Sequence, residues 1–153
     1  MLLKYSHKTR NLQVDDHIFS ASCHVRNEIN KRRLVNQVVY TIPDKTPYYP
    51  RQFPIGTWEI YEATSTKNPE MAPYIIRTNA FLMVDAWEVK NGKYYKNLGI
   101  KVKDAGYHIH LLAMFRTTQG CIGVQNLEDI VMIYKMVREA FERKEKIILE
   151  VTA

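Results

Sequence analysis

Three side chains able to take part in nucleophilic chemistry fall within fourteen residues of the chain, and these are His108, His110 and Cys121. If residues 107–113 form a strand, the two histidines share one face, because side chains alternate along a strand. A histidine close to a cysteine in space can accept its proton, and the resulting thiolate is the reactive form of the sulfur. The segment therefore predicts a cysteine nucleophile, although an isolated cysteine is also commonly a small buried apolar side chain.

The residues around Cys121 supply the other parts of such a site. Thr117, Thr118 and Gly120 precede the cysteine, and a glycine lets the backbone approach a substrate closely. Backbone N–H groups near Gly120 and Cys121 would hold the negative charge that develops on an attacked carbonyl oxygen. We assign His110 as the general base because it is nearer to Cys121 in the sequence than His108. His108 would then pack or orient the substrate.

Two segments resemble a known family. Residues 117–122 (TTQGCI) resemble the catalytic signature of the L,D-transpeptidase (YkuD-like) family, a Ser/Thr-His-Gly-Cys-hydrophobic run preceded by a histidine. Residues 53–60 (FPIGTWEI) are similar to that family's Pro-x-Gly-Thr-aromatic segment, which leads into a strand. The two motifs occur in the family's order, and the resemblance extends loosely over residues 34–124. It implies a β-sandwich fold and a cysteine acyl enzyme that acts on peptidoglycan stem peptides, releases D-alanine and passes the acyl group to an amine or to water.

The resemblance also implies roles for individual residues. Cys121 and His110 would be catalytic, with no metal and no cofactor. The other implied site residues are the loop and oxyanion residues Thr118, Gln119 and Gly120 and the substrate-binding residues His108, Arg116 and Gly123. The sequence departs from the family at Gln119, where the family has histidine, and at Gly123, where it usually has Asn or Arg. The gap from His110 to Thr118 is also shorter than usual. These departures indicate a divergent, compact branch of the kind carried by phages.

Two other functions use the same sequence features. A zinc-dependent cell-wall amidase would use His108, His110 and Cys121 as ligands and leave a fourth position open, but no obvious general-base glutamate accompanies them. A non-enzymatic basic binding module, for example for nucleic acid, would depend on the pI of about 9.3 and the ten tyrosines. Because the tyrosines lie mostly in strand-like runs, core packing explains them better, and we expect no nucleic-acid partner.

The composition is that of a single globular domain. The chain has 153 residues and a mass of 18.0 kDa, a length that fits one domain over residues 1–153. Its net charge is +6. Positive charge is densest at residues 31–33, which either meet an anionic polymer or form a solvated turn. No apolar run suits a membrane span or a signal peptide. We therefore expect a chain that is cytoplasmic as made and acts at the cell wall or in a phage context if the resemblance holds.

The predicted elements are mostly strands. Runs rich in β-branched and aromatic residues occur at residues 34–42, 57–63, 80–89, 107–113 and 147–151. Residues 91–92 (Asn-Gly) predict a hairpin turn, and the prolines of residues 43–54 predict a loop with a fixed path.

One segment has a helical pattern. Asn126 is a suitable N-cap, and the apolar residues that follow it repeat at helical spacing, which predicts a helix over residues 126–144 with one buried face. The side chains expected in the core are Trp58, Tyr61, Trp87 and Tyr107. The whole pattern predicts an α+β fold, mostly β, in which a β-sandwich or barrel-like sheet packs against one long helix in the C-terminal half.

Overall fold

The structure, a computed structural model, describes residues 1–23, 34–35, 38–40, 52–90, 93–112 and 120–153. Within these residues it contains two β-sheets and a single helix, so the expected mostly-β fold with one long helix is confirmed. The larger sheet is a closed barrel of eight strands rather than the two packed layers of a β-sandwich. Closure pairs both edges of every strand of this sheet, which leaves no open edge.

The barrel strands follow one another in an order that differs from their order in the chain. Around the barrel they are β1 (Leu2–Ser6), β12 (Ile147–Thr152), β6 (Gly56–Ser65), β7 (Tyr74–Thr78), β10 (His108–Leu111), β11 (Ile122–Val124), β3 (His17–Ser22) and β2 (Asn11–Val14). The pairs β1–β12 and β10–β11 are parallel, and the other pairs of the barrel are antiparallel.

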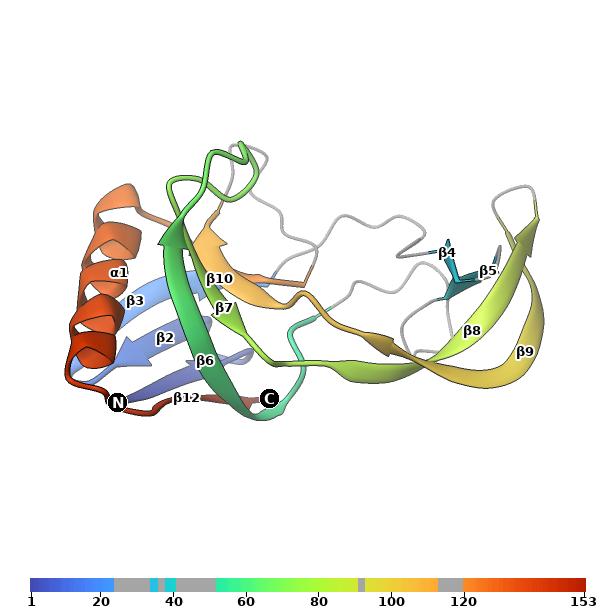
Figure 1. The fold of residues 1–153 in the computed structure, drawn as a ribbon, viewed down its shortest axis with the longest axis horizontal. Helices are drawn as coiled ribbons and strands as arrows, with labels where there is room; N and C mark the ends of the chain where they lie inside the picture. The colour runs from blue at the N-terminus through green and yellow to red at the C-terminus, as the bar shows by residue number, and fades with distance from the viewer. Residues whose placement is uncertain (24–33, 36–37, 41–51, 91–92, 113–119) are drawn as a thin grey trace.

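A second sheet extends from the barrel as an arm (Figure 1). It has four strands in the order β4 (Leu34–Val35), β5 (Val38–Tyr40), β8 (Leu82–Lys90) and β9 (Lys93–Asp104). Strand β8 follows β7 in the chain, and β9 precedes β10. Because β7 and β10 are themselves paired, the arm continues this pair of barrel strands outward.

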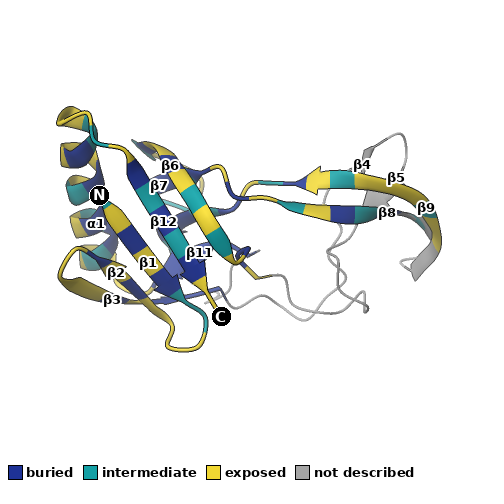
Figure 2. Cartoon of the chain, turned by 90° about the horizontal axis from the view of Figure 1, so that it is seen from below, coloured by how far each residue is buried: buried dark blue, intermediate teal, exposed yellow. Residues whose placement is uncertain are grey.

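The core lies inside the barrel and is built by the period-two alternation of strands. In β1, for example, Leu3 and Tyr5 are buried while their neighbours are exposed, as the banded strands of Figure 2 show. Leu149 and Val151 on the neighbouring β12 contribute in the same way. The apolar residues of the short strands therefore meet in one continuous cluster.

The helix α1 (Leu127–Glu142) lies at the opposite end of the molecule from the arm (Figure 1). Its buried residues join the barrel core, and these are Ile130, Ile133, Val137 and Ala140. Tyr134 also stacks on Tyr74 of β7, with ring centroids 3.9 Å apart. Asn126 is the N-cap residue as expected, but its side chain makes no capping hydrogen bond to the backbone and instead donates to Asp129.

Several expected elements are confirmed, and others were not foreseen. The runs at 57–63, 80–89, 107–113 and 147–151 correspond to β6, β8, β10 and β12. Strands β1, β2, β3 and β7 gave no clear sequence signal. In the turns between the first three strands, Arg10 and Asp15 occupy the positions of positive φ, with values of 56° and 51°. Glycine usually takes such positions, and without it the turns could not be recognised in the sequence.

The expected aromatic core is correct only in part. Tyr107 is fully buried and Trp58 is packed against the core at intermediate exposure, but Tyr61 is 53% exposed. Tyr61 lies beside the irregular pairing between Ile60 and Glu62, where β6 shifts its register against β7. The side chain of Trp87, the basic residues 31–33, most of the proline segment and the turn at 91–92 lie outside the described residues.

In the part of the chain that the structure describes, no helix has the length and apolar character needed to cross a membrane.

A pair of isoleucine substitutions tests the barrel core. Ile60 of β6 is 1% exposed, whereas Ile18 of β3 is 66% exposed. Because Ile60→Ala leaves a cavity between packed strands, we expect it to lower the free energy of unfolding by about 2–5 kcal/mol. The matched change Ile18→Ala should cost under about 1 kcal/mol. Urea unfolding followed by circular dichroism measures both, and equal losses would contradict this account of the core.

Candidate active site

The parallel pairing of β10 with β11 brings the predicted site residues together. Ile109 pairs with Ile122, and His110 pairs with Gly123. Both isoleucines are fully buried in the barrel core, so the residues on either side of them face outward. The expected alternation is therefore confirmed over residues 107–111, with His108 and His110 on one face and Tyr107, Ile109 and Leu111 on the core side.

Cys121 lies immediately before β11, next to both histidines. Its sulfur accepts a hydrogen bond from the backbone N–H of His108 at 3.3 Å. The thiol in turn donates to the carbonyl oxygen of Gly106 at 3.5 Å. The side chain is 8% exposed, and it forms no disulfide with Cys23. A backbone N–H that donates to the sulfur favours its negatively charged form.

His110 is held between a backbone carbonyl and the cysteine. Its Nδ1 donates to the carbonyl oxygen of Leu111 at 2.7 Å, which leaves Nε2 as the nitrogen that can take up the thiol proton. Burial by itself would lower the pKa of His110. The hydrogen bond to Cys121, the charge of its thiolate, the Leu111 carbonyl and the carboxylate of Glu70 outweigh burial, so the pKa is raised above its ordinary value. These interactions favour an imidazolium beside a thiolate.

His108 has the opposite electrostatic environment. Its Nδ1 accepts a hydrogen bond from the backbone N–H of Thr78 at 3.2 Å. Burial, the positive charge of Arg77 and that of His110 lower the pKa of His108 to about 4. The ring is therefore neutral near pH 7, with its proton on Nε2. Because a neutral ring whose Nδ1 is an acceptor cannot serve as the base through that atom, His110 is the better placed base.

Two glycines shape the backbone around the sulfur. Gly120, directly before Cys121, has φ of 97°, and Gly106, whose carbonyl faces the sulfur, has φ of 91°. Other residues rarely adopt this region because their Cβ atoms would clash. Gly120 is thus required for the turn that presents Cys121. Gly123 lies directly opposite His110 on β11, where any larger side chain would share the face occupied by the imidazole.

A buried hydrogen-bond network fixes the bend that leads into the site. The hydroxyl of Tyr107 donates to Asp104 at 2.6 Å, and both residues are buried. The hydroxyl of Thr78 donates to the carbonyl of Tyr107 at 2.6 Å. The ring of Phe53 contacts that of Tyr107 edge-on, with centroids 5.6 Å apart. Contacts from Asp104, Thr78 and Phe53 therefore fix the position of Tyr107 and, with it, the start of β10 at His108.

The second cysteine has a different character. Cys23 is buried, and burial raises its pKa to about 12 against hydrogen bonds from Tyr5 and the Phe53 backbone, while the nearby charge of Cys121 raises it further. Burial also raises the pKa of Tyr5. Cys23 is thus a protonated core residue near pH 7.

The alternative hypothesis of a zinc site finds no support among the described residues. Among the described residues, which include His108, His110 and Cys121, no group of three or more His, Cys, Asp or Glu side chains is placed to hold a metal ion. The Nδ1 atoms of both histidines are already engaged with the backbone. The Cys121 thiol instead interacts with the side chain of His110 and with the backbone N–H of His108.

Some predicted site residues cannot be placed, and some contributing residues were not predicted. Thr118, Gln119 and Arg116 lie outside the described residues. Glu70, Thr78 and the Leu111 carbonyl act on the histidines, but Glu70 and Thr78 lie at least 30 residues away in the chain from the histidine they affect. Nothing in their local sequence marks them, because only the pairing of β7 with β10 brings this region together.

No family model, curated protein or solved structure matches this chain.

Matched asparagine substitutions test which histidine is the base. In His110→Asn the side-chain amide can still donate to the Leu111 carbonyl, but it has no nitrogen in the place of Nε2 that could accept the thiol proton. We expect alkylation of Cys121 by iodoacetamide at pH 7 to slow at least about tenfold, because the thiolate fraction falls to the few per cent of an ordinary thiol. In His108→Asn the amide oxygen can still accept from Thr78, and the rate should change less than about twofold.

The measurement is the rate of alkylation against pH, with the modified residue located by peptide mass mapping. The wild-type protein should keep reacting at pH values below the range in which an ordinary thiol is alkylated. If only His108→Asn loses this reactivity, His108 and not His110 is the base.

Proposed function

We propose that this protein is a cysteine-dependent acyltransferase or hydrolase with Cys121 as nucleophile and His110 as general base. The observation that carries the proposal is the two-sided anchoring of the His110 ring, whose Nδ1 donates to the Leu111 carbonyl while the ring is hydrogen-bonded to Cys121. A nucleophile within reach of a base that a third group orients is the arrangement common to cysteine acyl enzymes.

The chemistry follows from this arrangement in two steps. The Cys121 sulfur attacks a carbonyl carbon, and the His110 imidazolium gives its proton to the departing amine as the acyl enzyme forms. His110 then accepts a proton from water or from an acceptor amine, which attacks the thioester and releases Cys121. Backbone N–H groups near Gly120 and Cys121 are the proposed donors to the oxyanion of both tetrahedral intermediates.

Burial of the pair supports a catalytic thiolate in particular. His110 is 4% exposed and Cys121 is 8% exposed, so their opposite charges interact in a medium of lower dielectric than water. Loss of one partner would leave the other charge buried and unpaired. The raised pKa of His110 keeps the imidazolium populated at pH values where an ordinary histidine is neutral.

The substrate class we propose is peptidoglycan stem peptides, on an L,D-transpeptidase-like domain of compact, divergent type. The support is that Phe53, in the first segment with family resemblance, contacts Tyr107 at the entry to β10. Strand β10 pairs with β11, which Cys121 of the second segment directly precedes. Residues from Gly56 onward also lead into a strand, β6, as in that family. The eight-stranded barrel closure and the changes at Gln119 and Gly123 are the features by which this chain would differ.

An adduct experiment tests the proposal. The protein is incubated with peptidoglycan tetrapeptide fragments or with a carbapenem, and the intact mass is recorded. We expect a covalent addition that maps to Cys121, disappears in Cys121→Ala and persists in Cys23→Ala, since Cys23 is the protonated core thiol. If the enzyme transfers the acyl group to amines, adding an acceptor such as glycine should convert part of the released product from the free acid to the amide. An unmodified Cys121 under all these conditions would overturn the proposal.

A further inference from the structure

A row of four residues crosses four neighbouring strands beside the nucleophile. Glu62 of β6 pairs with Arg77 of β7, and Arg77 pairs with His108 of β10. Cys121 directly precedes Ile122, just as His108 precedes the paired Ile109, and the His108 N–H contacts the Cys121 sulfur. Directly opposite residues in a sheet share a face. The row Glu62–Arg77–His108–Cys121 therefore lies along one outward face of the barrel.

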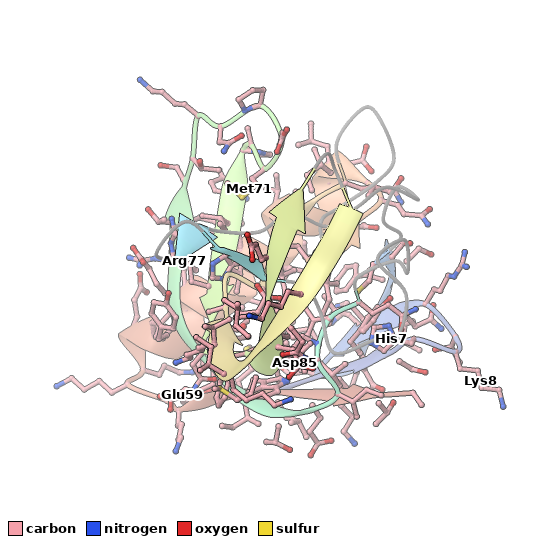
Figure 3. All side chains as sticks on the ribbon, turned by 90° about the vertical axis from the view of Figure 1, so that its right-hand side faces the viewer. His7, Lys8, Glu59, Met71, Arg77 and Asp85 are labelled. Carbon is pink, nitrogen blue, oxygen red and sulfur yellow. The ribbon has the colours of Figure 1, made fainter. Side chains whose placement is uncertain are left out.

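Arg77, labelled in Figure 3, is the cation of this row and is only loosely engaged. Its Nε lies 3.3 Å from a carboxylate oxygen of Glu62, and the two side chains are 37% and 49% exposed. An exposed ion pair of this kind contributes little net free energy. A second carboxylate of suitable position can therefore replace Glu62 at small cost, and the guanidinium fork binds carboxylates through two parallel hydrogen bonds.

His108 adds a hydrogen-bond donor beside this cation. Its Nδ1 is occupied by the Thr78 N–H, and its ring is neutral near pH 7 partly because Arg77 is close. The remaining ring donor is Nε2–H, on a residue that lies between Arg77 and Cys121 in the row. A neutral donor next to a guanidinium suits a negatively charged oxygen and not a cation.

We propose that Arg77 and His108 together bind a carboxylate of the substrate, with Glu62 occupying the guanidinium when no substrate is present. Neighbouring strands are about 4.8 Å apart, so the backbone of Arg77 lies roughly 10 Å from that of Cys121 across two spacings. Binding therefore requires the Arg77 side chain to turn from Glu62 toward His108. A carboxylate held between Arg77 and His108 would lie about one to three extended residues from the carbonyl that Cys121 attacks, because an extended chain spans roughly 3.5 Å per residue. This inference depends on the proposed function for its meaning, but its test does not.

The test uses two thiol reagents that differ only in charge, 3-maleimidopropionate and 3-maleimidopropionamide. Both label Cys121 without any enzymatic turnover, and peptide mass mapping separates this label from that on Cys23. We expect the carboxylate reagent to react about tenfold faster than the amide, the ratio that one charge-assisted hydrogen bond provides. In Arg77→Gln the ratio should fall close to one, and in Arg77→Lys it should be intermediate.

Three further variants make the result specific. Glu62→Gln removes the competing carboxylate and should raise the ratio, whereas His108→Asn should lower it. Arg143→Gln removes the same charge from the exposed end of the helix, where Arg143 pairs with Glu145, and should leave the ratio unchanged. An equal fall in the Arg143 and Arg77 variants would show general attraction to a basic protein and would overturn the inference.

The outcome is distinguishable from that of the proposed function. A carboxylate preference that depends on Arg77, found together with no acyl enzyme on any peptide, supports this binding site and removes the proposed reaction. An acyl enzyme on Cys121 with a ratio indifferent to Arg77 supports the reaction and overturns the binding site.

Discussion

The burial of Ile109 and Ile122 is the constraint from which the arrangement of the candidate site follows. These residues face each other across the parallel β10–β11 pair and are fully enclosed in the barrel core. Because side chains alternate along a strand, enclosing these two residues forces their neighbours outward. The demand for apolar burial thus places His108, His110 and Gly123 on one face, with Cys121 at its edge. The reactive groups need no dedicated scaffold beyond the core itself.

The pKa values of His108 and His110, which are separated by one residue, are displaced in opposite directions on this face. His110 lies against a thiol and within the field of a carboxylate, which together overcome burial and raise its pKa. Burial, together with the positive charges of Arg77 and His110, lowers the pKa of His108. When neighbouring titratable groups have pKa values displaced in opposite directions, their environments indicate which acts as base and which acts as hydrogen-bond donor. The sequence motif His-x-His does not contain this distinction.

What sequence reasoning could foresee depended on whether the signal was local. The helix, the strand predicted around residues 107–113 and the run at 147–151 each carry a pattern within one segment, and they correspond to α1, β10 and β12. The juxtaposition of His110 and Cys121 also followed from short separation in the chain. Barrel closure in place of a sandwich depends on pairing between β1 and β12, about 145 residues apart. Arg77, Glu70 and Thr78 were missed for the same reason, since their role arises only from strand register.

The position of β12 in the barrel has a consequence for folding. This strand lies between β1 and β6, so it supplies the pairing partner for one edge of each. A chain that has not yet produced residues 147–152 leaves both edges open, and unpaired edges are templates for association with other chains. Two of the eight pairings of the barrel, β1–β12 and β12–β6, therefore wait for this strand. The β1–β12 pairing joins segments of very large sequence separation, which is typical of slow folding. Until β12 is in place, the free edges of β1 and β6 are therefore the parts of the barrel most open to association with other chains.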